Sequence, residues 1–196
     1  SSLAEAIAHD GVLVERHLAR HAAWETNAFA ALNTAFVEDG AFLHIPADAS
    51  LPMPIELLFL ATSPGALVQP RVLIVAGAGS RFKVVERYMG FTGEAYFANT
   101  VTEIDAAPGA SVDHYVLQEQ GAHALHITTL AADLAHESSF STCGMTFGGR
   151  LARTTLAVAL AAAAGAASAF DFGLHVEDQL DAHSMQLFGI VEPLID

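Results

Sequence analysis

Four short turns of small residues divide the middle of this chain into segments of nearly equal length. Each turn ends in serine, namely Ser80, Ser111, Ser139 and Ser168. Each interval between them holds two stretches rich in β-branched and aromatic residues, with another turn between, which is the composition of strands. A nearly fixed period of roughly 30 residues is typical of solenoids. The repeat therefore predicts a mainly β fold, a parallel β-helix of stacked two-strand coils.

The alternative is a β-sandwich whose turns happen to be evenly spaced. A sandwich would more often contain tight Asn-Gly or Asp-Gly hairpins, and residues 41–190 contain neither. Alternation with period two supports strands that are buried on one side. One face holds Phe82, Val84 and Tyr88, and the other holds Arg81, Lys83 and Arg87.

Similar alternation runs through residues 152–160 and 170–176. The alanine-rich tract Ala157–Ala169 lies between them and has a high helix propensity. We nevertheless predict strand, turn and strand, because the repeat places Gly165–Ser168 at a turn.

The N-terminal residues carry a helical pattern instead. Leu3, Ile7, Val14 and Leu18 recur at helical spacing, which predicts helix over residues 3–22. Asp10-Gly11 should break this helix in two. We divide the chain into N-terminal helices at 1–25 and a β-helix core at 26–196, with the strand-rich body at 24–188.

Charge and composition exclude several classes of protein. Lys plus Arg number 8 against 22 Asp plus Glu, a formal net charge of −14. Such a chain repels nucleic acids and anionic membranes, so a partner that docks by charge should be basic. The longest apolar run, Leu156–Phe170, is shorter than the roughly 20 residues of a spanning helix. With one cysteine and no signal-peptide pattern, we expect a cytoplasmic protein.

The sequence predicts neither a catalytic site nor a nucleotide site. Val72–Gly79 resembles the strand and glycine turn of a dinucleotide site, but the third glycine position holds Phe82 and a strand follows. No paired carboxylates, GxSxG elbow or kinase loop occurs.

The sequence also predicts no metal site. Among the ten histidines, His123 and His126 are three residues apart and would face opposite sides of a strand. We interpret them, with His114 and His136, as surface or half-buried positions. For Cys143 we expect an inward-facing structural thiol, on the same face as Met145 and Phe147.

An ordered series of segments resembles the SufD family of the SUF iron–sulfur cluster assembly system. The order and spacing of these segments carry the resemblance, and Gln179, Asp181 and His183 resemble a landmark near the middle of the family's β-helix. The segments are residues 30–36, 39–40, 42–46, 54–55, 58–59, 70–75, 84–88, 96–104, 114–118, 126–127 and 151–156. The paralogue SufB usually carries a cysteine-containing stretch where this chain has Met89–Gly93.

The resemblance implies a right-handed parallel β-helix and a non-catalytic scaffold. SufD pairs with SufB, and each engages a copy of the ATPase SufC. The iron–sulfur cluster and reduced flavin are implied for the assembled complex, and no residue of this chain is assigned to either. Family members continue through further coils to a C-terminal helical region, so the SufC contact should lie outside these residues.

Two other functions remain open from the sequence. One is a carbohydrate-active β-helix enzyme, which needs a strand face lined with acids and aromatics. The other is a bare β-solenoid interaction domain, because the open ends of a β-helix expose unpaired strand edges that another copy could cover.

Overall fold

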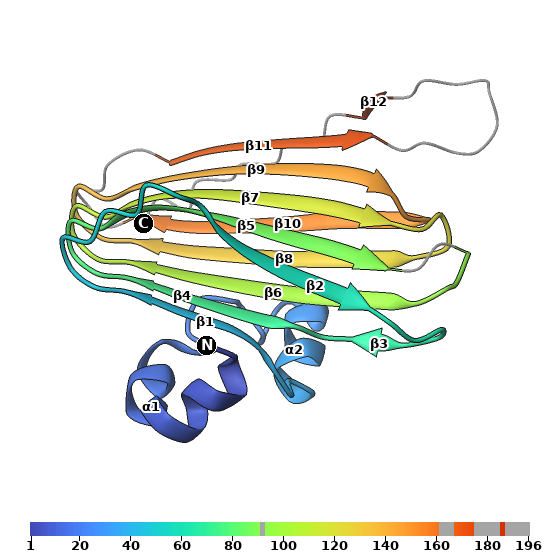
Figure 1. Cartoon of the computed structure of the whole chain (residues 1–196), viewed down its shortest axis with the longest axis horizontal. Helices are drawn as coiled ribbons and strands as arrows, with labels where there is room; N and C mark the ends of the chain where they lie inside the picture. The colour runs from blue at the N-terminus through green and yellow to red at the C-terminus, as the bar shows by residue number, and fades with distance from the viewer. Residues whose placement is uncertain (91–92, 161–166, 175–184, 187–196) are drawn as a thin grey trace.

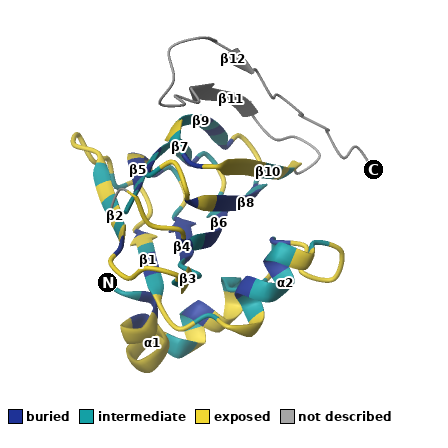
Figure 2. Cartoon of the chain, turned by 90° about the vertical axis from the view of Figure 1, so that its right-hand side faces the viewer, coloured by how far each residue is buried: buried dark blue, intermediate teal, exposed yellow. Residues whose placement is uncertain are grey.

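The chain folds as a parallel β-solenoid with two helices on one side (Figures 1 and 2). This computed structural model describes residues 1–90, 93–160, 167–174 and 185–186. Sheet A contains β1 (Gly40–Ile45), β4 (Arg71–Ala76), β6 (Phe97–Ala106), β8 (Leu125–Leu134) and β10 (Leu151–Leu160), with the short β3 (Leu67–Val68) beside β6. Sheet B contains β2 (Ile55–Ala61), β5 (Arg81–Gly90), β7 (Ser111–Gln120), β9 (Ser139–Gly148), β11 (Ala167–Leu174) and β12 (Met185–Gln186).

The chain alternates between the two sheets. Every described strand pair is parallel except β11 with β12. Parallel neighbours that are two strands apart in sequence define stacked coils. The predicted β-helix is therefore confirmed and the sandwich is excluded. Strands β10 and β11 confirm the strand assignment at both ends of the alanine tract, whereas residues 161–166 lie outside the described part of the chain.

The coils are not all of one length. Gly40 lies beside Arg71, and Arg71 lies beside Val101. The later coil from Leu125 to its register partner Leu151 is shorter than either of these. Ser111 and Ser139 are register partners, but Arg81 rather than Ser80 lies beside Ser111. The serines thus mark the turns without occupying one equivalent position.

The described turns that lead from sheet A to sheet B share one backbone feature. Each of these four turns contains a left-handed residue, namely Asp48 (φ 60°), Gly79 (φ 66°), Gly109 (φ 71°) and Glu137 (φ 57°). The Gly79 N–H donates to Pro108 O at 3.0 Å, and the Gly109 N–H donates to His136 O at 3.0 Å. The turns therefore continue the hydrogen-bond ladder from coil to coil. The turn at Asp48 extends the repeat one coil further toward the N-terminus than the serine pattern predicted.

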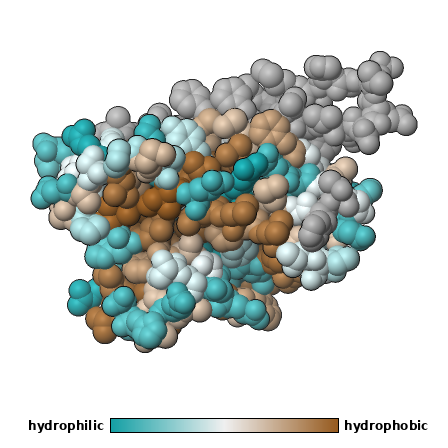
Figure 3. Space-filling model, in the orientation of Figure 1, coloured by the Kyte–Doolittle hydropathy of each residue, from teal (hydrophilic) through white to brown (hydrophobic). Residues whose placement is uncertain are grey.

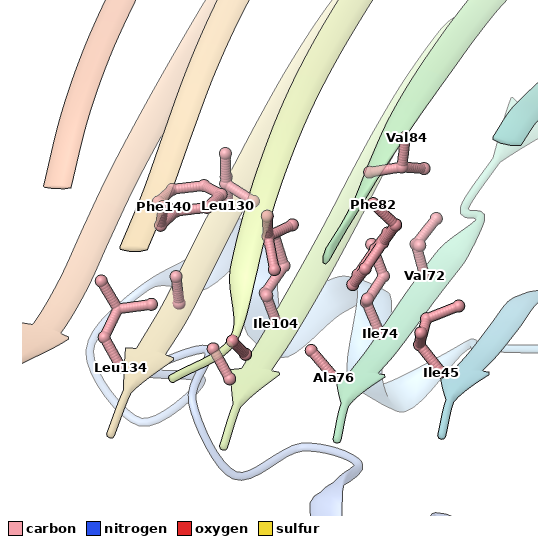
Figure 4. Close-up of a cluster of buried hydrophobic side chains, with 14 of the residues drawn as sticks. Ile45, Val72, Ile74, Ala76, Phe82, Val84, Ile104, Leu130, Leu134 and Phe140 are labelled. Carbon is pink, nitrogen blue, oxygen red and sulfur yellow. The ribbon is translucent and has the colours of Figure 1, made fainter. Parts of the chain in front are cut away.

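The main apolar core lies inside the coils, at the end where these turns stack (Figure 4). Phe82 and Val84 point inward from β5, and Ile74, Ile104 and Leu130 meet them from sheet A. Tyr88 is also buried, whereas Arg81 and Lys83 are exposed and Arg87 is half-buried. The predicted alternation in β5 is thus confirmed.

The N-terminal helices cover the outer face of sheet A (Figure 2). Helix α1 (Leu3–His17) is kinked at Asp10, where φ is −125°, as predicted. It ends at His17, so the helix predicted to Leu18 and beyond is too long. Leu3, Val14 and Leu73 form a second apolar cluster between α1 and the sheet.

A second helix, α2 (Ala28–Ala35), begins after Asn27, whose side chain accepts from the N–H groups of Phe29 and Ala30. It lies beyond the predicted domain boundary at residue 25, and that boundary stays a prediction. In the described part of the chain, no helix is long and apolar enough to cross a membrane.

Candidate functional site: polar clusters inside and beside the solenoid

The interior of the solenoid changes character along the strands. Near the stacked turns it is apolar, but toward the ends of β5 and β7 the inward positions become polar. The buried polar side chains here include Glu86, His114, Gln118, His126 and Thr142. Because a buried polar group is costly unless it is hydrogen-bonded, each of these needs a partner inside the coil.

Glu86 is the centre of this interior cluster and is fully buried. Its carboxylate accepts from Tyr88 Oη at 2.6 Å, from Thr102 Oγ1 at 2.9 Å and from His114 Nε2 at 3.0 Å. Burial alone would raise the pKa of Glu86, but His114 and these hydrogen bonds outweigh it and lower the pKa. Glu86 is therefore an ionised carboxylate at neutral pH, held by donors from three strands.

His126 lies next to this group and is also buried. Its ring is 4.9 Å from the Tyr88 ring in an edge-on arrangement, and its Nε2 lies 2.8 Å from Thr128 Oγ1. Burial lowers the pKa of His126 to about 4, against the opposing effect of Glu86. His126 is thus neutral at pH 7, and its Nδ1 has no hydrogen-bond partner within the described part of the protein.

A second polar cluster joins sheet A to the N-terminal segment. Arg71 on β4 and Glu103 on β6 are both buried, and Arg71 Nη2 lies 2.6 Å from Glu103 Oε2. Glu103 also accepts from the backbone N–H groups of Ala19, His21 and Ala22, at 2.8, 2.8 and 2.9 Å. Burial would raise the pKa of Glu103, but Arg71 and these N–H groups lower it. One carboxylate thus holds the loop after α1 against the solenoid.

Two histidines extend this junction. His17 Nδ1 lies 2.6 Å from Asp105 Oδ2, while His21 lies 3.6 Å from Asp105 and 3.7 Å from Asp133. The nearby Asp105 carboxylate raises the pKa of His21, and the same contact lowers the pKa of Asp105. Ion pairing here therefore strengthens when His21 is protonated.

The interpretation of the histidines is partly wrong. His123 and His136 are exposed, as expected, but His114 and His126 are buried inside the solenoid. Alternation within β5 and β7 could have located the cluster, because it places Glu86 on the face of Val84 and His114 on the face of Val112.

The prediction that Cys143 faces the interior is also wrong. On β9 the inward residues are Phe140 and Thr142, which are buried, and Cys143 takes the opposite face. Its neighbours on that face are Met145, which is half-buried, and Phe147, which is 39% exposed. Two predictions fall outside the described part of the chain. The first concerns the side chains of β11, some of which were predicted to share a face. The second is the landmark at Gln179, Asp181 and His183.

These clusters are suited to holding the fold rather than to binding a metal. Across residues 1–90 and 93–160, no three His, Cys, Asp or Glu side chains are arranged to hold a metal ion. The turn after Val72–Ala76 leads into strand β5, so no helix N-terminus is present there to receive a phosphate. On the outer face of sheet B, Asp113 pairs with Lys83, and Glu56 and Glu119 both pair with Arg87.

Fold and clusters together define a parallel β-solenoid whose interior carries a buried carboxylate, Glu86, that accepts hydrogen bonds from Tyr88, Thr102 and His114. Residues 59–187 match the family model "SUF system FeS cluster assembly, SufBD core domain", and residues 1–57 match "SufBD protein N-terminal region". The chain belongs to the SufBD family.

Curated relatives agree with this assignment. An iron–sulfur cluster assembly SufBD family protein of Synechocystis, slr0076, is 32% identical over 138 residues, which cover 65% of this chain and 30% of the relative. The Arabidopsis thaliana family members ABCI8, chloroplastic, and ABCI9 are 34% and 36% identical, over 60% and 58% of this chain. These matches cover 21% and 24% of the two Arabidopsis proteins, so the chain spans less than a third of these relatives.

Proposed function

We propose that this chain is part of a non-catalytic scaffold of the SUF iron–sulfur cluster assembly machinery, in the manner of SufD. The observation that carries the proposal is the match of the solenoid itself, over residues 59–187, to the SufBD core domain. The proposed partners are a SufB-like paralogue and a SufC-like ATPase. The proposed setting is the cytoplasm.

A scaffold role agrees with the chemistry of the described residues. The buried carboxylates Glu86 and Glu103 are each held by several donors of the protein itself. In this role the iron–sulfur cluster is cargo, and reduced flavin would belong to the assembled complex. The described residues do not fit a cluster site, because Cys143 is a single, half-buried thiol on the outer face of β9.

Affinity purification of the tagged chain, expressed together with SufB-like and SufC-like proteins of its own source, tests the proposal. We expect the SufB-like protein to co-purify, and we expect a full-length version to retain the SufC-like ATPase as well. Failure of a folded full-length version to retain either protein contradicts the proposal.

If a SufD-like protein is co-expressed as well, its retention in place of the SufB-like protein would assign this chain to the SufB side of the family. Activity on a polysaccharide panel that one acid substitution abolishes would favour the carbohydrate-active alternative.

A further inference from the structure

The solenoid is open at its first coil. Strand β2 lies at one edge of sheet B and is paired with β5 alone, so its other backbone edge has no strand beside it in the described part of the chain. The corresponding edge of β1 is partly covered, because Ser2 forms an antiparallel bridge with Ala41. The free edge therefore belongs to β2.

Side chains in this coil are less buried than their partners in the next one. Ile55 and Phe59 point into the solenoid and are half-buried, whereas their register partners on β5, Val84 and Tyr88, are 0% and 2% exposed. The difference has a simple cause: β5 has a coil on each side and β2 has a coil on one side. A further strand along β2 would bury Ile55 and Phe59 as Val84 and Tyr88 are buried.

The surface around this edge is also apolar on the outside. Leu58 and Leu60 are 59% and 52% exposed, and Met53 and Leu51, just before the strand, are 74% and 36% exposed. Figure 3 shows hydrophobic surface gathered over β2, on the face of the molecule where Figure 1 draws β2 in front. Edge strands usually carry a lysine, a proline or a bulge that blocks pairing, but Ile55–Ala61 carries one charge, Glu56, and no proline. Such an edge is typical of a docking site.

The charge of the first coil identifies the kind of partner. Residues 37–70 contain four carboxylates, Glu38, Asp39, Asp48 and Glu56, and neither lysine nor arginine. Arg87 of the second coil reaches Glu56 at 3.7 Å, and Asp39 accepts the N–H of Ala4 at 3.0 Å. A second copy would bring the same carboxylates to the interface, from a chain whose formal net charge is also −14. Charge complementarity therefore disfavours self-association at this end.

We propose that β2 is the docking edge for an extended, basic segment of another polypeptide, which adds to sheet B as a strand. Backbone hydrogen bonds along β2 give affinity, and apolar side chains at alternate positions of the segment cover Ile55 and Phe59 on one face or Leu58 and Leu60 on the other. Basic residues of the segment meet the carboxylates of the first coil. This surface adjoins the interior cluster, because Phe59 stacks on Tyr88 with 4.9 Å between the ring centroids. The inference does not rest on the proposed function.

Titration of the full chain with two fluorescent peptides tests the proposal, one of alternating lysine and valine and the other of alternating glutamate and valine. The lysine peptide should bind, more weakly as salt is raised, and the glutamate peptide should not. Amide hydrogen exchange should slow across residues 55–61 when the lysine peptide is bound. The double variant Leu58→Ser/Leu60→Ser should weaken binding by about tenfold or more, from the loss of apolar contact.

The matched control is Val12→Ser/Leu151→Ser, which changes two exposed apolar residues, 70% and 49% exposed, away from β2. It should bind the lysine peptide as the parent chain does, and circular dichroism should show that both variants are folded. Equal binding of the two peptides, unchanged affinity in the β2 variant, or unchanged exchange across residues 55–61 would overturn the proposal. Dimerisation of the parent chain in sedimentation that the β2 variant abolishes would also overturn it, because the occupant would then be a second copy.

Discussion

Arg71 and Glu103 form an ion pair that is fully enclosed between sheet A and the segment after α1, with 2.6 Å between Nη2 and Oε2. Both side chains are almost completely inaccessible, at 1% and 0%. Arg71 also donates to Asn33 Oδ1 at 3.1 Å and to Thr34 Oγ1 at 3.2 Å, so the pair reaches α2 as well. The loop after α1, through Glu103, and helix α2, through Arg71, are thus fixed to the same ion pair.

Replacement of Glu103 should be strongly destabilising. Glu103→Ala leaves Arg71 buried without its counter-charge and removes the acceptor of three backbone N–H groups, so the free energy of unfolding should fall by about 3–5 kcal/mol. Urea denaturation measures the change. The exposed Glu25→Ala should alter it by less than about 0.5 kcal/mol. A loss below about 1 kcal/mol for Glu103→Ala would mean that the pair contributes little.

The His21 junction should make stability fall on the alkaline side. The folded-state pKa of His21 is raised above 6.5. Its contribution is therefore complete below about pH 6.5 and is lost as pH rises through the folded pKa. Asp105, Asp133 and Glu103 raise the pKa of this ring, and His17 shares Asp105 with it.

Unfolding free energies of the parent and of His21→Gln, measured from pH 5.5 to 9, should differ most at low pH and converge as pH rises. The exposed His123→Gln should follow the parent throughout. A constant difference between parent and His21→Gln would contradict the role of protonation.

Glu86 should make the stability of the folded chain fall at acid pH. Its pKa in the folded protein is lowered from 4.5, so its contribution is present above about pH 4.5 and is lost as pH falls through the folded pKa. Glu86→Gln should reduce the free energy of unfolding at pH 7 by about 1.5–3 kcal/mol, because the hydrogen bonds lose their charged acceptor. The loss should shrink toward low pH.

Urea unfolding followed by circular dichroism between pH 3 and 7 measures both the loss of unfolding free energy at pH 7 and its change toward low pH. Glu86 also raises the pKa of His126 against the effect of burial, so the comparison reports on Glu86 together with its effect on His126. Glu56→Gln, on the outer face of β2, serves as the exposed control. A pH-independent difference between Glu86→Gln and the parent would show that the pKa of Glu86 is the same in the folded and unfolded chain, which would contradict the lowered pKa.

A side chain at Gly40 should not be tolerated. A Cβ built on Gly40 meets the backbone of Arg71, the neighbouring strand's first residue, and backbone atoms cannot move aside cheaply. Gly40→Ala should therefore lower the thermal midpoint by several degrees, equivalent to about 1–3 kcal/mol. Gly11→Ala, where a Cβ meets nothing within 4 Å, should leave the midpoint unchanged or raise it. Equal midpoints for the two variants would contradict this close approach.

Much of the solenoid follows from local chemistry that the sequence displays. Alternation in β5 places Phe82, Val84 and Tyr88 inside because a strand has period two, and small residues recur where each coil must turn. The break at Asp10-Gly11 is likewise local. These features depend on neighbours in sequence, and the sequence by itself therefore determined the fold class and the position of the coils.

The tertiary structure decided which polar groups meet. Glu86, His114 and Thr142 lie 28 residues apart in succession and come together because consecutive coils place them beside one another. Glu103 meets the loop after α1 although the two are far apart in the sequence. The lengths of the coils, which are unequal, decide which side chains become neighbours. A register shift by a single position would turn each side chain of a strand to the other face. The face of Cys143 was decided in the same way, because the parallel register with β7 sets the inward positions of β9.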